Sequence, residues 1–203
     1  MARLGMGVFA GLSLLVALMS LRVLVLPMEQ AMPHMMHFLV ATPWGLWGHV
    51  VLAPLVLLLA PLQMWTGLRH RLPVLHRWSG RLYALAVLLA ATAGFALALA
   101  AESRASGFAR AGFMVLAGGW FAATAMGVLR ALQGDLARHR WWMQRSLALT
   151  FSAVSLRLIM GPLVAGGWTV AETYDVTAWG SWMLNLTVLE LWQRRRRRVS
   201  ALA

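Results

Sequence analysis

The chain has 203 residues, 61% of them hydrophobic, and a mean hydropathy of +0.70. A soluble domain is roughly 45–50% apolar, so the composition indicates a protein that sits in lipid. There is no cysteine, which excludes disulfides, iron–sulfur clusters and thiolate metal sites. The formal net charge of +12 is of a size found in nucleic-acid-binding proteins, but the placement of the arginines indicates membrane orientation instead.

Six apolar runs are each predicted to cross a hydrocarbon core about 30 Å thick, which takes about 20 helical residues. In chain order they cover 5–26, 46–66, 81–101, 111–132, 142–164 and 176–193, and the last is the shortest. A signal peptide is the alternative for the first run. No small-residue cleavage pattern precedes Pro27, however, which favours a retained span. The sequence therefore predicts an all-α integral membrane bundle of six transmembrane helices in a single domain, 1–203.

The arginines predict the orientation of this bundle. With the N-terminus inside, 14 of the 18 arginines fall on the inner side, as the positive-inside rule requires. An even number of spans then places both termini in the cytoplasm. The tail, 194–203, becomes a basic cytoplasmic segment that binds anionic lipid. We expect a multi-pass protein of the bacterial inner membrane that contacts membrane lipids and binds no nucleic acid.

Three polar residues from three predicted spans share one depth near the outer surface. Arg157 lies 16 residues beyond Trp141, which is about 24 Å of helix rise, and Arg22 and His49 lie at a similar height. An intramembrane arginine costs about 2.5–3.5 kcal/mol and is usually retained for a partner. These residues predict a site for a haem propionate, a quinone head group or a small anionic ligand. The alternative is that both arginines extend to the outer head groups.

The loop before the second span, PMEQAMPHMMHF, combines methionines with His34 and His37. Thioether and imidazole groups suit copper, especially Cu(I), so these histidines are weak candidate copper ligands. The alternative is an amphipathic segment that lies on the outer leaflet.

Two inner segments each carry a His-Arg pair before a span, His76-Arg77 and His139-Arg140. A haem b needs two imidazoles from neighbouring helices, which His76 and His139 would supply if their spans are adjacent. The alternative is that these pairs bind lipid phosphate and carry charge that sets the topology. Gln63 lies near the inner end of the second span, about 21 Å below His49.

The segments LHRWSGRLY (75–83) and HRWWMQRSLALTFSAVSLRL (139–158) resemble the motifs of a family of bacterial polytopic membrane proteins with a domain of unknown function. The family pattern is LHR-x-x-GR-x-Y, then HR-x-WM-x-RS-x-A and a later LR. The resemblance covers roughly 40–160 and includes His49 and a PxQ element at Pro61 to Gln63, with Ala60 where the family has glycine. The matching positions are His76, Arg77, Gly80, Arg81, Tyr83, His139, Arg140, Trp142, Met143, Arg145, Ser146, Ala148 and Arg157.

In outline this layout is similar to di-haem transmembrane cytochromes, which pass electrons between ascorbate or quinol and an outer acceptor. The resemblance implies further cofactor-binding candidates in Arg77, Arg81, Tyr83 and Arg145. Those cytochromes place two histidines on one span about four turns apart. Here the position that pairs with His49 is Gln63, a poor axial ligand, which argues against a two-haem arrangement.

We therefore predict a membrane-embedded redox or electron-transfer protein that binds haem b or quinone. One alternative is a transporter or copper-handling protein, for which Pro54 and Pro61 would break the second span. The other is a non-catalytic accessory or assembly subunit of a larger membrane complex. The sequence contains no Ser-His-Asp set, HExxH, Walker motif or glycine-rich dinucleotide loop.

Overall fold

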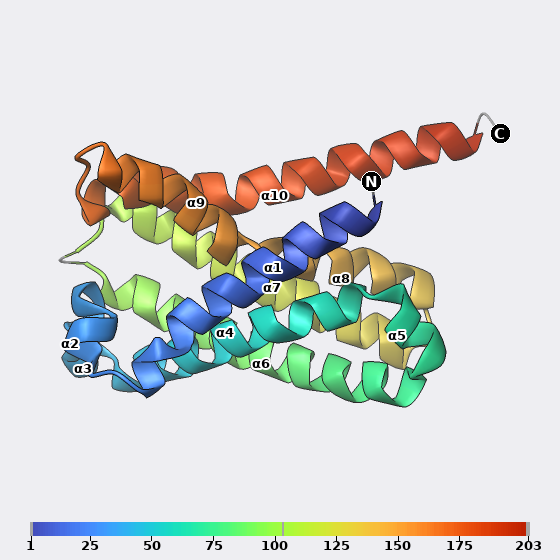
Figure 1. The fold of residues 1–203 in the computed structure, drawn as a ribbon, viewed down its shortest axis with the longest axis horizontal. Helices are drawn as coiled ribbons and strands as arrows, with labels where there is room; N and C mark the ends of the chain where they lie inside the picture. The colour runs from blue at the N-terminus through green and yellow to red at the C-terminus, as the bar shows by residue number, and fades with distance from the viewer. Residues whose placement is uncertain (1, 103, 202–203) are drawn as a thin grey trace.

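The computed structural model describes residues 2–102 and 104–201, with side chains for 4–102 and 104–196, and every regular element in these ranges is a helix. The long helices form one bundle (Figure 1). They are α1 (Ala2–Leu21), α4 (Pro43–Met64), α6 (Pro73–Ala100), α7 (Gly107–Leu132), α8 (Leu136–Thr150), α9 (Ser152–Ala165) and α10 (Val170–Ala201). The short elements are η1 (Arg22–Leu24), α2 (Met28–Ala31), η2 (Pro33–Met35), α3 (Phe38–Ala41) and α5 (Thr66–Arg71).

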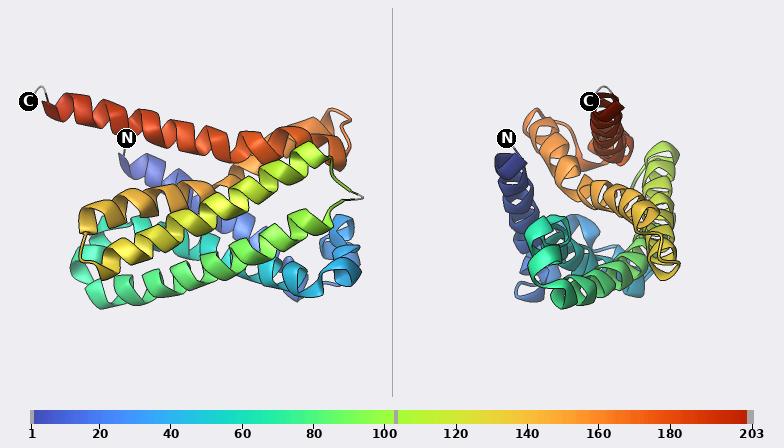
Figure 2. Two further views of the ribbon diagram at one scale, coloured as in Figure 1. Left: turned by 180° about the vertical axis from the view of Figure 1, so that it is seen from behind. Right: turned by 90° about the vertical axis from the view of Figure 1, so that its right-hand side faces the viewer.

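Successive crossings of the bundle run in alternating directions, with α8 and α9 together forming one crossing, so the bundle has two distinct ends (Figures 1 and 2). The α3 end, at the left of Figure 1, carries α2, η2, α3 and the connections after α6 and after α9. The α5 end carries α5 and the turn between α7 and α8. The described parts of α1 and α10 begin and finish toward the α5 end, so the two chain termini lie on the same side of the bundle.

Five segments within the described residues are long and apolar enough to cross a membrane: Leu4–Leu24, Pro43–Met64, Pro73–Ala100, Gly107–Leu132 and Leu136–Ala165. The all-helical, multi-pass class predicted from the sequence is thereby confirmed. The sixth predicted span, 176–193, lies within α10 and is not among the five. It is helical, but Thr177, Asn185 and Glu190 lower its hydropathy.

Both sequence motifs begin inside helices, because α6 begins at Pro73 and α8 at Leu136, earlier than the predicted span starts at 81 and 142. Pro73 occupies the first turn of α6, where its missing N–H and fixed φ favour helix initiation. Asp135 caps α8, and its side chain accepts a 3.0 Å hydrogen bond from the Arg138 backbone N–H. These two residues begin the helices earlier than hydropathy alone predicts. His76 and His139 therefore have helical backbones.

The fifth crossing consists of two helices, α8 and α9, which meet at Phe151. Thr150 Oγ1 donates to the Ser146 carbonyl at 3.0 Å, and Ser152 Oγ donates to the Ala148 carbonyl at 3.4 Å. Such bonds from Ser and Thr back to the preceding turn often bend helices. Because of this break, α8 packs on α7 while α9 reaches α1 and α10 (Figure 1).

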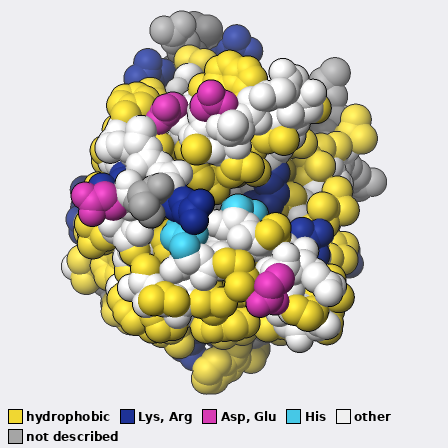
Figure 3. Space-filling view, turned by 90° about the vertical axis from the view of Figure 1, so that its left-hand side faces the viewer, with side chains coloured by type: hydrophobic (Ala, Val, Ile, Leu, Met, Phe, Trp, Pro, Cys, Tyr) yellow, Lys and Arg dark blue, Asp and Glu magenta, His cyan; other side chains and the backbone are white. Residues whose placement is uncertain are grey.

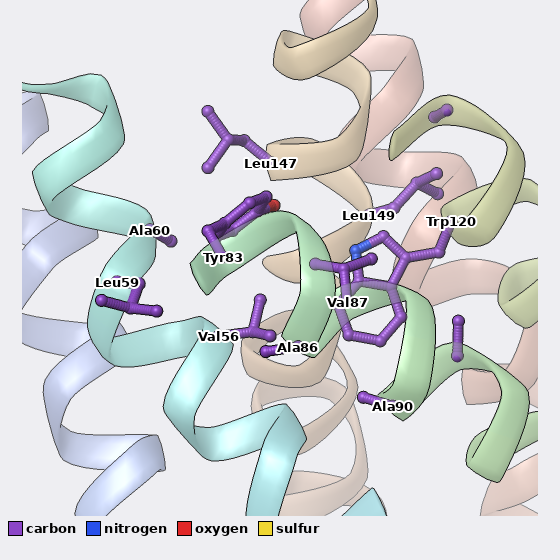
Figure 4. Close-up of a cluster of buried hydrophobic side chains, with 12 residues drawn as sticks. Val56, Leu59, Ala60, Tyr83, Ala86, Val87, Ala90, Trp120, Leu147 and Leu149 are labelled. Atoms are coloured by element: carbon purple, nitrogen blue, oxygen red, sulfur yellow. The ribbon is translucent and has the colours of Figure 1, made fainter. Parts of the chain in front are cut away.

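The main hydrophobic core lies where α4, α6, α7 and α8 meet (Figure 4). Small residues on α6 let the helices approach closely, and larger side chains fill the remaining space. The buried residues of this core are Val56, Leu59, Ala60, Tyr83, Ala86, Val87, Ala90, Ala91, Trp120, Ala123, Leu147 and Leu149.

An ion pair holds the C-terminal half of α10 against α8. Arg145 is buried, pairs with Glu190 and lies with its guanidinium carbon 3.2 Å from the centre of the Trp141 ring. One turn further along α10, Gln193 donates a 2.7 Å hydrogen bond to Gln144. A buried guanidinium requires a partner, so Glu190 explains how Arg145 is accommodated.

We expect Glu190→Gln to destabilise the folded protein by about 1–3 kcal/mol, because it leaves the buried charge of Arg145 without its carboxylate. Unfolding in mixed micelles with increasing SDS measures this difference. Arg138→Gln is the control: it also breaks an ion pair, with Asp135 at 3.5 Å, but the Arg138 side chain is 66% exposed, and we expect a change below about 0.5 kcal/mol. Equal effects of the two substitutions would contradict this role of Glu190.

Candidate functional site

A network of hydrogen-bonding side chains is buried at the centre of the bundle. The Tyr83 hydroxyl lies 2.9 Å from Ser146 Oγ and 2.7 Å from Thr150 Oγ1. Thr124 Oγ1 lies 2.7 Å from Ser146 Oγ, and Trp120 Nε1 donates to Thr150 Oγ1 at 3.0 Å. All five side chains are buried. The network therefore joins α6, α7 and α8 at one depth within the apolar core.

The network contains fewer hydrogens than polar contacts. Thr124 also donates to the Trp120 carbonyl and Thr150 to the Ser146 carbonyl, so six hydrogen bonds would require six hydrogens. The five side chains supply one each. At any moment one oxygen–oxygen contact of Tyr83 therefore lacks a hydrogen, and the tyrosine hydroxyl can point to either Ser146 or Thr150.

The two inner histidines are placed by this network. His76 precedes Tyr83 by seven residues on α6, and His139 precedes Ser146 by seven residues on α8. Seven residues are two helical turns, so each histidine lies on nearly the same helix face as the network residue that follows it. Because α6 and α8 run in the same direction (Figure 1), both histidines lie at one depth toward the α5 end. The charge of His139 acts on His76.

Hydrogen bonds to backbone carbonyls orient two of the histidine rings. His139 Nδ1 lies 2.8 Å from the carbonyl oxygen of Gly127, and His49 Nδ1 lies 3.0 Å from that of Ala90. Because a carbonyl only accepts, Nδ1 carries the hydrogen and Nε2 keeps its lone pair. Metal-binding histidines are held in the same way. His139 and His49 are thus both prepared to act as ligands through Nε2.

Polar nitrogens without partners remain at the α5 end. His76 Nδ1 and Arg130 Nε are both buried and have no hydrogen-bond partner. The charge of Arg69 also acts on His76. Buried polar atoms are nearly always paired in folded proteins. His76 Nδ1 can bind a metal or form a hydrogen bond, whereas Arg130 Nε can only donate a hydrogen bond, for example to an anionic or carbonyl-bearing group.

Glycines on α6 accommodate the two polar residues of α4. A Cβ atom at Gly94 would lie 3.0 Å from His49 Nδ1, and one at Gly80 would lie 3.0 Å from Gln63 Oε1. His49 and Gln63 are 14 residues apart on α4, and Gly80 and Gly94 are 14 residues apart on α6. This equal spacing is expected of two helices that pack antiparallel. Gln63 donates a 2.8 Å hydrogen bond to Ser79, so its amide serves helix packing. His49 lies about 21 Å from Gln63 along α4, and thus toward the opposite end from His76 and His139.

The structure brings the two outer arginines to His34. Arg22 donates from Nε and Nη2 to the Ala31 carbonyl, at 3.2 and 2.7 Å. Arg157 donates to the Ala153 carbonyl at 2.8 Å and to Ser20 on α1 at 3.0 Å. The charges of both arginines act on His34, and that of Arg157 also reaches His49. Arg22 is thus turned toward the loop rather than toward His49.

The two loop histidines lie close enough to influence each other. Burial lowers the pKa of His34, and the charges of Arg157, His37 and Arg22 lower it further. Burial and Arg104 lower the pKa of His37, which a hydrogen bond with the backbone of His34 partly opposes. No group of three or more His, Cys, Asp or Glu that could hold a metal occurs among the described residues. Copper binding by His34 and His37 stays a prediction.

The remaining candidates lie around the α5 end. Arg81 and Arg77 are exposed, and the Arg81 guanidinium carbon lies 4.7 Å from the centre of the Trp78 ring. Arg145 and Tyr83 have structural partners, described above. Sequence reasoning did not identify Thr124, Thr150 or Glu190. The equal spacing from His76 to Tyr83 and from His139 to Ser146 is the signal that could have indicated that the two motifs face each other.

The lowered pKa values of His34 and His37 predict acid sensitivity. Both histidines bind protons more weakly in the folded state than in the unfolded state, where the pKa is about 6.5. Their contribution to stability is therefore fully present above that value and is lost as the pH falls through the lower folded pKa. We expect the melting temperature to fall less from pH 7 to pH 5 in the double variant His34→Asn, His37→Asn. His70→Asn, at the opposite end, is the control, and an equal fall in all three proteins would contradict the assignment.

Because the buried network has one hydrogen too few, we expect Tyr83→Phe to destabilise the protein less than Thr150→Val does. Without the tyrosine hydroxyl, every remaining hydrogen of the network still has an acceptor. We therefore expect the free energy of unfolding to fall by no more than about 1 kcal/mol. Thr150→Val keeps the side-chain volume but leaves the Trp120 N–H without an acceptor, at a cost of about 1–3 kcal/mol. SDS unfolding compares the two. A larger loss for Tyr83→Phe would show that its hydroxyl has an obligatory partner.

A comparison with protein families identifies the chain. The family described as Predicted membrane protein (DUF2306) matches residues 46–193, a range that includes both motifs and the helices that carry the buried network. Comparisons with curated proteins and with solved structures found no match. The membrane character and the family resemblance inferred from the two motifs are therefore confirmed: the chain belongs to the DUF2306 family of membrane proteins.

Proposed function

We propose that this protein is a membrane-embedded redox protein that binds haem b or a quinone beside His76 and His139. The observation that carries the proposal is the shared register of α6 and α8. The buried contact between Tyr83 and Ser146 lies two turns from both histidines, which supports one shared depth for the two imidazoles on α6 and α8. A pair of imidazoles of this kind could hold a b-type haem through its iron.

The side chains at the α5 end suit a haem. His139 offers Nε2 because Nδ1 is held by the Gly127 carbonyl, and His76 offers a buried nitrogen without a partner. Arg69, whose charge acts on His76, and Arg130 would neutralise the propionates. A haem bound here would supply one-electron chemistry, and the protein would orient it and shield it from water.

A quinone is the second ligand that the same nitrogens fit. His76 with its hydrogen on Nδ1, and Arg130 through Nε, could each donate a hydrogen bond to a quinone carbonyl. Quinone head groups lie near the membrane surface, where the α5 end would be. The two ligands therefore use the same residues and differ in their visible spectra.

We further propose six crossings, with both termini in the cytoplasm of a bacterium. Helix α10 lies along α7, α8 and α9 and ends on the same side as the start of α1 (Figure 2). The α5 end carries Arg69, Arg71, Arg77, Arg81, Arg130, Arg138, Arg140 and Arg194 to Arg196, as the positive-inside rule expects of a cytoplasmic surface. The histidine pair would then lie near the inner face of the inner membrane.

The visible spectrum of the protein, expressed with its haem supply intact and purified in detergent, tests this function. We expect a Soret band that shifts when dithionite is added, and its loss in His76→Ala and in His139→Ala. His70→Ala, an exposed histidine at the same end, should keep the band. If the wild-type protein is colourless, a quinone should appear in its solvent extract and be absent from that of His76→Ala. A protein with neither ligand would contradict the proposal and favour a transporter, a copper-handling protein or an accessory subunit.

A further inference from the structure

A second group of basic residues lies at the α3 end, opposite the histidine pair. Arg157, on α9, crosses to α1 through its 3.0 Å hydrogen bond to Ser20. Arg22 follows α1 and binds the carbonyl oxygen of Ala31 in the loop. His34 lies within range of both arginine charges. Two parts of the chain that are far apart in the sequence, the connection after α1 and helix α9, thus bring positive charge to one place.

Two more basic residues extend this group. The charge of His37 acts on His34, and that of Arg104 acts on His37. Figure 3 shows this face of the molecule: histidines and basic side chains gather near its middle, and the acidic side chains lie around its margin. We call Arg22, His34, His37, Arg104 and Arg157 the outer basic cluster.

The acidic residues of the α3 end are engaged elsewhere. Glu102 lies 4.0 Å from Arg110. Glu172 accepts hydrogen bonds from the backbone N–H and hydroxyl of Thr169, at 2.7 and 2.8 Å, and Asp175 accepts one from Ser106. Among the side chains that the structure describes, neither these acids nor Glu29 forms an ion pair with the outer basic cluster. Its charge is therefore not neutralised by the described part of the chain.

The cluster also retains donors for a ligand. A guanidinium has five N–H groups, and Arg157 directs one from Nη1 and one from Nη2 at oxygens of the protein. His37 Nε2 is buried and has no hydrogen-bond partner. Several donors from different directions suit an oxyanion with several oxygens, and arginine matches phosphate geometry especially well.

We infer that the outer basic cluster binds a phosphate group, with Arg157, Arg22 and His34 as its central residues. The phosphate can belong to the head group of an anionic lipid or to a dissolved phosphate. Arg157 lies eight residues before the end of the membrane-crossing segment Leu136–Ala165, about 12 Å of helix rise, so its long side chain can reach the depth of lipid phosphates. Basic side chains and histidines are visible on this end face of the molecule (Figure 3). This site is separate from the histidine pair and does not depend on the redox proposal.

Thermal unfolding of the detergent-purified protein tests the inference. The melting temperature is followed during titration with phosphatidylglycerol, with phosphatidylcholine and with inorganic phosphate. We expect phosphatidylglycerol or inorganic phosphate to raise it and phosphatidylcholine to leave it unchanged. A rise with the lipid alone identifies a lipid head group, and a rise with inorganic phosphate identifies a dissolved anion as a sufficient ligand. No rise with either would overturn the site.

Substitutions distinguish a built site from diffuse attraction. Arg157→Gln and Arg22→Gln should each weaken the apparent affinity about tenfold or more. Arg157→Lys keeps the charge but loses the planar fork, so it should lie between Arg157→Gln and the wild type. If Arg157→Gln does not fold, the affinity of Arg157→Lys is compared with that of the wild type instead. The control is Arg110→Gln, which removes a positive charge from the same end that is already paired with Glu102. Equal weakening by Arg110→Gln and Arg157→Gln would contradict a specific site.

Discussion

Polar side chains inside a bundle surrounded by lipid must find their partners within the protein, because hydrocarbon offers none. The network of Tyr83, Trp120, Thr124, Ser146 and Thr150 meets this requirement at the centre of the fold. It holds α6, α7 and α8 at one relative height. The position of every other polar residue of these helices along the bundle axis follows from this alignment.

Close packing around the network determines where the remaining polar groups lie. Gly80 and Gly94 leave room for Gln63 and His49, so α4 lies against α6 along its length. The break at Phe151 lets α8 contact α7 and α9 contact α1, while both halves of the fifth crossing contact α10. The outcome is a bundle with histidines at its α5 end and a separate basic cluster at its α3 end.

The sequence was sufficient to predict the five segments that are long and apolar enough to cross a membrane, since a run of about 20 apolar residues is typical of a membrane span. It was also sufficient for the family, because two motifs of mixed charged and aromatic residues are specific. Hydropathy could not find the true starts of α6 and α8, which depend on Pro73 and on the cap at Asp135. The direction of Arg22 depends on how the loop after α1 folds, and the partner of Arg145 lies 45 residues away at Glu190. Neither contact has a local signature in the sequence.

The central claim is that His76 and His139 lie near each other at one depth, and cross-linking tests it most directly. The chain has no cysteine, so the pair His76→Cys, His139→Cys can be introduced without removing any native thiol. A short bifunctional thiol reagent applied to membranes should link these positions rapidly. It should link Arg77→Cys with His139→Cys slowly, because one residue rotates the side chain about 100° around the helix. Equal rates, or no link at the histidine positions, would contradict the shared register of α6 and α8.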